Sequence, residues 1–348
     1  MIGKDIEESP TPEVWKALYE AAVEFKDLAP WGWMRDSDLF GVRNPQDNEI
    51  GYCCVLGKAG EVFGLTVYLG TEGLEEYLKD SQEDEDAIDD DALHRKNCLL
   101  LTFEDKKYLK KPDLNVIKNL GLEFSGRKAW PLFRNYRPGY FPWYLTANEA
   151  EFLTVCLRQA NDVVRRFKEN PNLFSSPGGE TRYVRIQDVN MEWKDAWLKP
   201  APLLRKMVLM VKSIDEERLE NIRKECTRQK ETWEIDYFYA PMYIAEKSKR
   251  PYFPVALLFA DRYSYFILNA HVSNHDNFRT EFFEELFKIF EEHKTIPEKI
   301  AVRKDEFILY LKPFSERLGI KVSMATKLRV IDSARKHMFE HFKKTQND

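Results

Sequence analysis

The stretch Trp233-Glu234-Ile235-Asp236-Tyr237-Phe238-Tyr239 decides the fold of the last third of the chain. It is dominated by aromatic and β-branched residues, which favour strands. Two more runs of this character follow, over residues 252–259 and 263–270. The tripeptide Ala260-Asp261-Arg262 between them is short enough to join antiparallel neighbours. We therefore predict three strands in succession.

Helices alternate with strands in the remainder of the chain. Phe282, Leu286 and Ile289 recur at helical spacing, and Gly319 is placed to end a helix. A strand–helix–strand unit of this length needs a parallel crossover. The sequence therefore predicts an α/β domain with a mixed sheet in the order βββαβαβα. Its later elements are predicted as a helix over 278–292, a strand over 299–303, a helix over 306–318, a strand over 320–324 and a helix over 333–342.

A linker is predicted at Lys199-Pro200-Ala201-Pro202, because two prolines in four residues break both helix and strand. Beyond it, residues 207–211 are a candidate strand. Ser213 with Glu216 forms a capping pattern for a charged helix that runs to about Thr227. We place the two domains at residues 1–200 and 205–348.

The first domain mixes helices and strands, which predicts an α+β fold. Thr146 and Glu149 match a capping box, while Thr11 is a candidate N-cap with Pro12 in the first turn. The predicted elements are helices over 12–28, 73–78 and 147–169, strands over 51–56, 62–69 and 97–103, and a candidate strand over 183–189.

Composition limits the class of protein. The 348 residues are 43% hydrophobic and 32% charged, so the chain can bury a sizeable core. A net charge of −5 argues against broad, sequence-independent binding to nucleic acid. No apolar run approaches the roughly 20 residues of a membrane span, and the N-terminus lacks the apolar segment of a secretion signal. Five cysteines without metal-binding spacing predict reduced thiols in a cytoplasmic protein.

The predicted element order resembles that of ribonuclease H-like domains, and the wording resembles integrase and transposase cores. Those cores open with Trp-x-x-Asp, as at Trp233 and Asp236. Their fourth strand leads to Asp and Phe before a helix that ends in Gly-Ile, as in the segment 300–320 with Asp305. Asp332 stands nearest to their third carboxylate, with Glu340 as an alternative. The resemblance implies two-metal phosphoryl transfer with Mg²⁺ or Mn²⁺.

The sequence also departs from this family. The family usually continues its second aspartate with Asn-Gly, whereas Glu306 and Phe307 follow Asp305 here. Asp305 and Asp332 also precede helical patterns and fit ordinary N-caps, while Asp236 can face solvent or a neighbouring strand. We therefore predict a non-catalytic binding or regulatory protein on a degenerate domain, without a cofactor. The alternative is a Mg²⁺- or Mn²⁺-dependent nuclease or phosphoryl-transfer enzyme that uses the three aspartates and acts on nucleic acid.

Two aromatic, proline-rich stretches are candidate binding surfaces. They are Pro30-Trp31-Gly32-Trp33 and residues 137–144. Prolines keep such segments extended, and large rings beside them can form a groove. A peptide, a protein or a small ligand is the expected partner. The candidate residues are Trp31, Trp33, Tyr140 and Trp143.

Two patterns in the sequence contain residue types that bind metals. The acidic run over 83–91 lacks the spacing and glycine of a calcium loop. His337 and His341 share a predicted helix face, and His271 and His275 have the same spacing, but neither pair has a third ligand nearby in the sequence. The sequence predicts no metal site from them.

The N-terminal wording resembles a bacterial domain of unknown function. In this family a second such domain typically follows, so the resemblance covers nearly the whole chain. It implies two domains and no known activity. The residues that carry it are Trp31-Gly32-Trp33-Met34, Asp38-Leu39-Phe40-Gly41-Val42, Gly51-Tyr52, Gly60-Glu61 and Val67-Tyr68-Leu69-Gly70.

Overall fold

The structure is a computed structural model that describes residues 8–81, 91–176, 178, 180–202, 214–246 and 249–345. The candidate strand over 207–211, Ser213 and nearly all of the acidic run lie outside the described residues. The chain divides into two compact units. The N-terminal unit holds residues 1–137 and 142–201, and the C-terminal unit holds 138–141 and 202–348. The domain limits expected from the sequence, 1–200 and 205–348, stay a prediction.

The N-terminal unit is built on a seven-stranded mixed sheet in the order β5-β4-β3-β2-β1-β6-β7. Neighbouring strands are antiparallel except β1 and β6, which run parallel. The strands are β1 (Phe40–Arg43), β2 (Ile50–Leu56), β3 (Gly64–Leu69), β4 (Cys98–Glu104), β5 (Trp130–Tyr136), β6 (Arg182–Gln187) and β7 (Trp193–Leu198).

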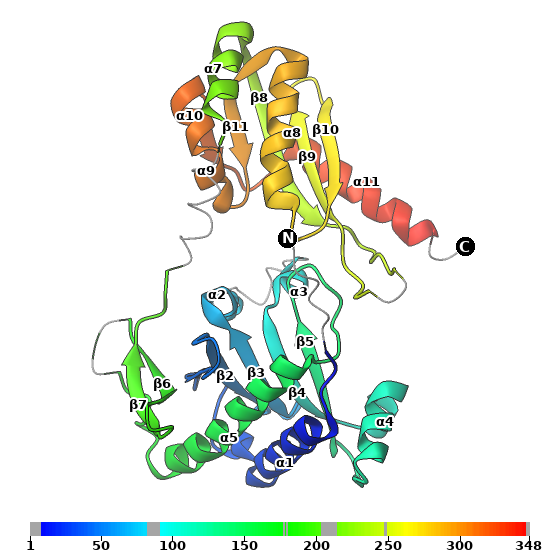
Figure 1. Cartoon of the computed structure of the whole chain (residues 1–348). Helices are drawn as coiled ribbons and strands as arrows, with labels where there is room; N and C mark the ends of the chain where they lie inside the picture. The colour runs from blue at the N-terminus through cyan, green and yellow to red at the C-terminus, as the bar shows by residue number, and fades with distance from the viewer. Residues whose placement is uncertain are drawn as a thin grey trace. The chain divides into compact units, whose positions relative to one another are not determined.

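Two long helices, α1 (Pro12–Leu28) and α5 (Ala147–Glu169), lie side by side across one face of this sheet (Figure 1). The capping box of Thr146 and Glu149 begins α5 as predicted, and Thr11 accepts the first-turn bond of α1. Helix α2 (Gly70–Asp80) covers part of the other face. The shorter helices are α3 (Ala92–Arg95), α4 (Lys111–Asn119), η1 (Pro30–Gly32) and η2 (Lys106–Tyr108).

The C-terminal unit has a five-stranded sheet in the order β10-β9-β8-β11-β12. Strands β8, β11 and β12 are parallel, and β9 is antiparallel to both β8 and β10. The strands are β8 (Thr227–Tyr239), β9 (Val255–Asp261), β10 (Ile267–Ser273), β11 (Thr295–Val302) and β12 (Lys321–Met324). The helices are α7 (Glu216–Glu225), α8 (Phe278–His293), α9 (Glu306–Tyr310), α10 (Lys312–Leu318) and α11 (Arg329–Thr345).

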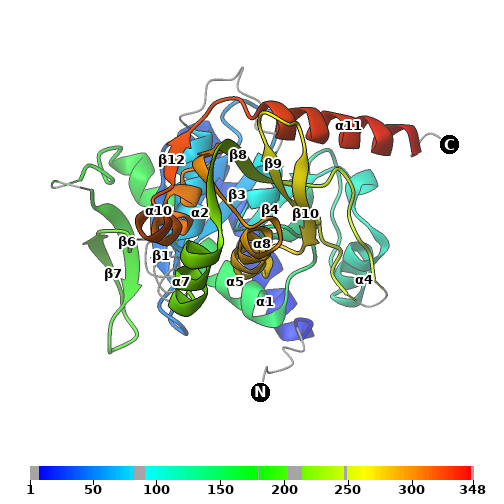
Figure 2. The ribbon, with the colours of Figure 1, turned by 90° about the horizontal axis from the view of Figure 1, so that it is seen from above.

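Helices cover both faces of this sheet. Figure 2 shows α11 on one side and α7, α8 and α10 on the other. Because successive side chains of a strand point to opposite faces, β8 serves two cores. Trp233, Ile235 and Tyr237 pack with α8, whereas Phe238 packs beneath α11. The same alternation places the carboxylates of Glu234 and Asp236 on the α11 side of the sheet.

The structure moves several predicted boundaries. Strand β10 begins at Ile267 instead of Tyr263, because the Ser264 N–H donates to Asp261 Oδ2 in a wider turn. The predicted helix over 306–318 is split at Leu311, two residues before Pro313, which lacks a backbone donor. Helix α7 is capped by Asp215, which accepts from the Arg218 N–H at 2.9 Å.

Three strands were not predicted. Strand β5 lies at the edge of its sheet, where Pro131 costs no ladder bond on its free side. Strand β7 lies at the opposite edge, and β1 is only four residues long. All five cysteines are free thiols, as expected. Among the described residues, no helix combines the length and apolarity required to cross a membrane.

Candidate functional site

Asp236 lies on the α11 face of β8, with 1% of its surface exposed. Its Oδ1 accepts hydrogen bonds from Lys304 Nζ at 3.0 Å and from the Tyr237 backbone N–H at 2.9 Å. Arg303 Nε lies 3.8 Å from its other oxygen. Burial raises the pKa of Asp236, and the charges of Lys304 and Arg303 oppose that rise. The carboxylate is thus enclosed between two cations that follow strand β11.

Arg303 also joins Asp236 to Asp332, because its guanidinium donates to Asp332 Oδ1. The second oxygen of Asp332 accepts from the Leu328 N–H at 3.0 Å. Helix α11 starts at Arg329, so Asp332 stands inside its first turn rather than before the helix. A carboxylate there is favoured by the helix dipole. The structure therefore brings two of the three predicted aspartates together around one arginine.

Asp305 has different surroundings. It is exposed and occupies the N-cap position of α9, but its side chain makes no capping hydrogen bond. The next residue, Glu306, turns into the opposite core. There it accepts hydrogen bonds from the hydroxyls of Tyr237 and, at 2.9 Å, Tyr310. Arg279 Nε donates to the Tyr310 hydroxyl at 3.1 Å, which completes a polar network beneath α8.

Glu234 is a site residue that sequence reasoning missed. It is fully buried on β8, two residues before Asp236 and on the same face. Its carboxylate accepts from the backbone N–H groups of Arg329 at 3.0 Å and Val330 at 2.8 Å. Arg262 Nε lies 3.1 Å from its Oε1. Glu234 therefore caps α11 from a distant strand. The strict alternation in the opening stretch was the signal for it.

These carboxylates do not form a metal cluster. Within the part of the chain that the structure describes, no three His, Cys, Asp or Glu side chains are grouped to hold an ion. His271 lies 2.8 Å from Glu281, whereas His275 lies 2.5 Å from the Tyr239 hydroxyl. His337 bonds to the carbonyl oxygen of Ser333 within α11. The histidines thus bind separate protein partners.

The four aromatic candidates lie in separate surroundings. Trp31 packs against Phe63 in the core, and Trp33 Nε1 donates to the Val164 carbonyl at 3.1 Å. Tyr140 belongs to the C-terminal unit and donates its hydroxyl to Asp276 at 2.7 Å. Trp143 lines a cavity of about 330 Å³ in the N-terminal unit. The contacts described for these four residues do not place them in one groove.

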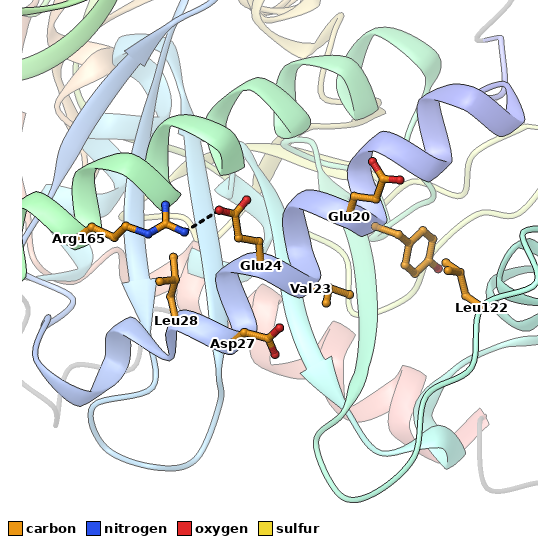
Figure 3. A pocket seen from close by; sticks show the side chains of 8 residues that line it. Glu20, Val23, Glu24, Asp27, Leu28, Leu122 and Arg165 are labelled. Atoms are coloured by element: carbon orange, nitrogen blue, oxygen red, sulfur yellow. Dashed lines mark hydrogen bonds and ion pairs between the residues drawn. The ribbon is translucent and has the colours of Figure 1, made fainter.

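A cavity of about 520 Å³ opens beside α1 (Figure 3). Its principal polar contact joins the two long helices, with Glu24 Oε1 2.6 Å from an Arg165 nitrogen. The hydrogen bond from Arg165 lowers the pKa of Glu24. Glu20 and Asp27 at its border are exposed. The Glu24–Arg165 pair is half exposed, and none of the predicted site residues lines this cavity.

Comparison with known proteins adds two matches. Residues 15–185 match a family model described as a domain of unknown function, DUF7309. Residues 218–339 match a second, described as a domain of unknown function, DUF6930. The expectation of two such domains is confirmed. No curated protein matches the chain. The matches carry no activity, so function rests on the geometry.

Proposed function

We propose that the C-terminal unit is a ribonuclease H-like domain without metal-dependent catalysis, and that the protein is a binding or regulatory protein. The order β10-β9-β8-β11-β12, with β9 antiparallel to its neighbours, supports the first part. In chain order its strands are arranged 3-2-1-4-5. The second part depends on the charges around Asp236.

The observation that carries the proposal is the pairing of Asp236 with Lys304. Two-metal catalysis needs carboxylate oxygens that converge on divalent ions. Here Lys304 and Arg303 already supply two positive charges beside Asp236 and Asp332. A divalent ion would have to displace the ammonium group and would be repelled by the guanidinium. The same face keeps Glu234 occupied with the N-terminus of α11.

A nuclease assay tests the proposal. The full chain is incubated with Mn²⁺ or Mg²⁺ and single- or double-stranded DNA and RNA. We expect no cleavage above that of the Asp236→Ala variant, and no saturable Mn²⁺ binding by calorimetry. Metal-dependent cleavage that Asp236→Ala and Asp332→Ala abolish, and that Glu298→Ala leaves intact, would overturn the proposal. That result would establish the nuclease alternative.

The cation pair offers a sharper arm of the same experiment. Lys304→Asp replaces the ammonium with a carboxylate beside Asp236, so it should introduce Mn²⁺ binding if the cation is what excludes the metal. Lys312→Asp, at an exposed position of α10, is the matched charge control. If Lys304→Asp and Lys312→Asp bind Mn²⁺ equally weakly, Lys304 is not what keeps the metal away from Asp236. That conclusion would hold even if the wild-type protein cleaves no nucleic acid.

A further inference from the structure

A third cavity, of about 560 Å³, lies within the N-terminal unit. Residues from α1, α5, the β1–β2 turn and the β6–β7 hairpin surround it. Its size falls in the range of small-molecule sites. Its apolar wall is formed by Val14, Ala17, Phe152, Val155 and Trp193. The amide side chains of Asn44, Gln159 and Gln187 also line the cavity, and we call it the amide pocket.

Gln159 lines the amide pocket and is only 8% exposed. Its Oε1 accepts a hydrogen bond from Arg185 Nε at 3.1 Å. A guanidinium has no acceptor, so the oxygen end of the amide must face Arg185. Over the described residues, no hydrogen bond uses the Nε2 group. The NH₂ group of a largely buried residue is therefore left accessible from the cavity.

Asn44 repeats this arrangement from the β1–β2 turn. It is 7% exposed, and its Oδ1 accepts the backbone N–H of Gln46 at 3.1 Å. A backbone N–H can only donate, so the orientation of this amide is also determined. Its NH₂ group has no hydrogen-bond partner in the described part of the chain. Two oriented donors thus border one cavity.

Gln187 supplies the complementary group. Its Nε2 donates to the Met191 carbonyl oxygen at 2.9 Å, which leaves Oε1 as an acceptor. Gln187 lines the same cavity from the end of β6. The amide pocket therefore offers two donors and one acceptor beside an apolar wall.

A network of ion pairs holds these groups in place. Arg185 is bonded to Asp195, which also accepts from the Tyr183 hydroxyl at 2.6 Å. Burial alone would raise the pKa of Asp195, but hydrogen bonds from Arg166, Tyr183 and Arg185 hold it well below its usual range. The charged form of Asp195 thus fixes Arg185, and Arg185 fixes Gln159. Such preorganisation reduces the entropy cost of binding.

The charges at the pocket argue for a neutral ligand. Its charged lining residues are Glu13, Glu151 and Arg158, two acids and one base. A phosphate or carboxylate ligand normally meets a surplus of cations. We infer that the amide pocket binds a small neutral molecule that carries an amide or imide group next to an apolar body. Its carbonyl oxygens accept from Asn44 and Gln159, and its N–H donates to Gln187.

The test uses the full chain and defined probes in titration calorimetry. N-acetyl-leucinamide represents the amide source, and thymine represents the imide source. N-acetyl-leucine keeps the apolar body and the acetyl amide of the first probe but carries a carboxylate in place of the terminal amide, so the pair tests the preference for a neutral ligand. We expect saturable binding of at least one neutral probe. N-acetyl-leucine should bind about tenfold more weakly than N-acetyl-leucinamide if the amide is the ligand.

Two isosteric variants test the donors. Gln159→Glu and Asn44→Asp keep the oxygen that accepts from Arg185 or Gln46, but they replace the NH₂ group with a second acceptor. Each should weaken binding about tenfold or more. Asn148→Asp is the control, since it adds the same charge at an exposed position of α5 that does not line the pocket. Urea unfolding and the side-chain NH₂ signals in NMR spectra show whether each variant is folded.

The inference is overturned if neither neutral probe binds saturably. It is also overturned if Asn148→Asp weakens binding as much as the pocket variants do. Where N-acetyl-leucinamide binds saturably, equally tight binding of N-acetyl-leucine likewise overturns it. The nuclease assay on the full chain reports on residues of the C-terminal unit and has no bearing on these outcomes. The inference and the proposed function can therefore fail separately.

Discussion

Two carboxylates beneath α11, Glu234 and Asp236, and two amides of the amide pocket, Asn44 and Gln159, are all buried, but their polar atoms differ in the partners they have. Glu234, Asp236 and Asp332 each have charged or backbone partners within the unit. Asn44 and Gln159 use their oxygens internally and leave their NH₂ groups without a protein partner. The first arrangement stabilises the fold, because buried polar groups are normally hydrogen-bonded. In the second, the NH₂ groups remain accessible and can bind a ligand or water.

The largest effect is expected at Glu234. Glu234→Ala removes the acceptor for the N-terminus of α11 and leaves Arg262 without its carboxylate. We expect a loss of about 3–5 kcal/mol in the free energy of unfolding, as for other broken buried pairs. Urea denaturation measures it. Glu298→Ala, at an exposed position of β11, should change stability by less than about 0.5 kcal/mol. Equal losses of stability in the two variants would mean that the buried contacts of Glu234 do not stabilise the fold.

The pairing of Asp236 with Lys304 can be isolated by a double-mutant cycle. Asp236→Asn should cost about 3 kcal/mol, because it leaves the Lys304 ammonium without its counter-charge. Adding Lys304→Met should recover a large part of that loss, since the pair is then replaced by uncharged groups. Denaturation of the four proteins gives the coupling energy. A coupling near zero would mean that the cations do not satisfy Asp236, against the comparison above.

Asp195 connects charge to the amide pocket through pH. Its pKa is lower in the folded protein than in the unfolded chain, so its contribution is fully present above the unfolded value of about 3.9. That contribution is lost as the pH falls below about 4 toward the folded pKa. Asp195→Asn should therefore make the N-terminal unit less sensitive to acid over this range. Stability measured between pH 3 and 6 checks the slope. Since the side chain is partly exposed, the effect should be smaller than those above.

Among the variants of the two regions, the smallest change in stability is expected from Gln159→Glu in the absence of ligand. The substitution keeps the bond to Arg185 and removes an NH₂ group that has no described partner. Stability at neutral pH should change by less than about 1 kcal/mol, because no hydrogen bond is lost. Thermal unfolding checks this. A loss as large as that of Glu234→Ala would show that the NH₂ group contributes to the fold, and the difference between the two regions would disappear.

Much of the local structure could be predicted from sequence. Helix α5 was predicted residue for residue, because Thr146 and Glu149 mark its start and Asn170-Pro171 prevents its continuation. Strand β8 was recognised from its aromatic residues, although it begins six residues earlier than expected. The exposed residues Thr227, Arg228 and Gln229 pair with β11 and contain no apolar pattern. Such strand ends depend on a partner strand rather than on their own composition.

The site could be predicted only in part. Asp236 and Asp332 were named from the sequence, and the structure places both on Arg303, a residue that the sequence pattern did not single out. The sequence predicted Asp305 as a third member of this site, because it follows β11. Asp305 is instead exposed at the start of α9, and no contact with Arg303 is described for it. Sequence spacing limits which residues share a face, whereas the pairing of charges depends on where helix ends meet the sheet.

By itself, the sequence determined the two-part organisation, most of the helices and the alternation that places Glu234 and Asp236 on one face of β8. These follow from short-range rules of capping, periodicity and turn chemistry. Only the tertiary structure decided that Glu234 caps α11 and that Lys304 neutralises Asp236. It also decided that Asn44 and Gln159, 115 positions apart by their numbers, border one cavity. The physical reason is that a hydrogen bond or ion pair depends on distance in space, and the chain sets that distance only when its strands and helices pack.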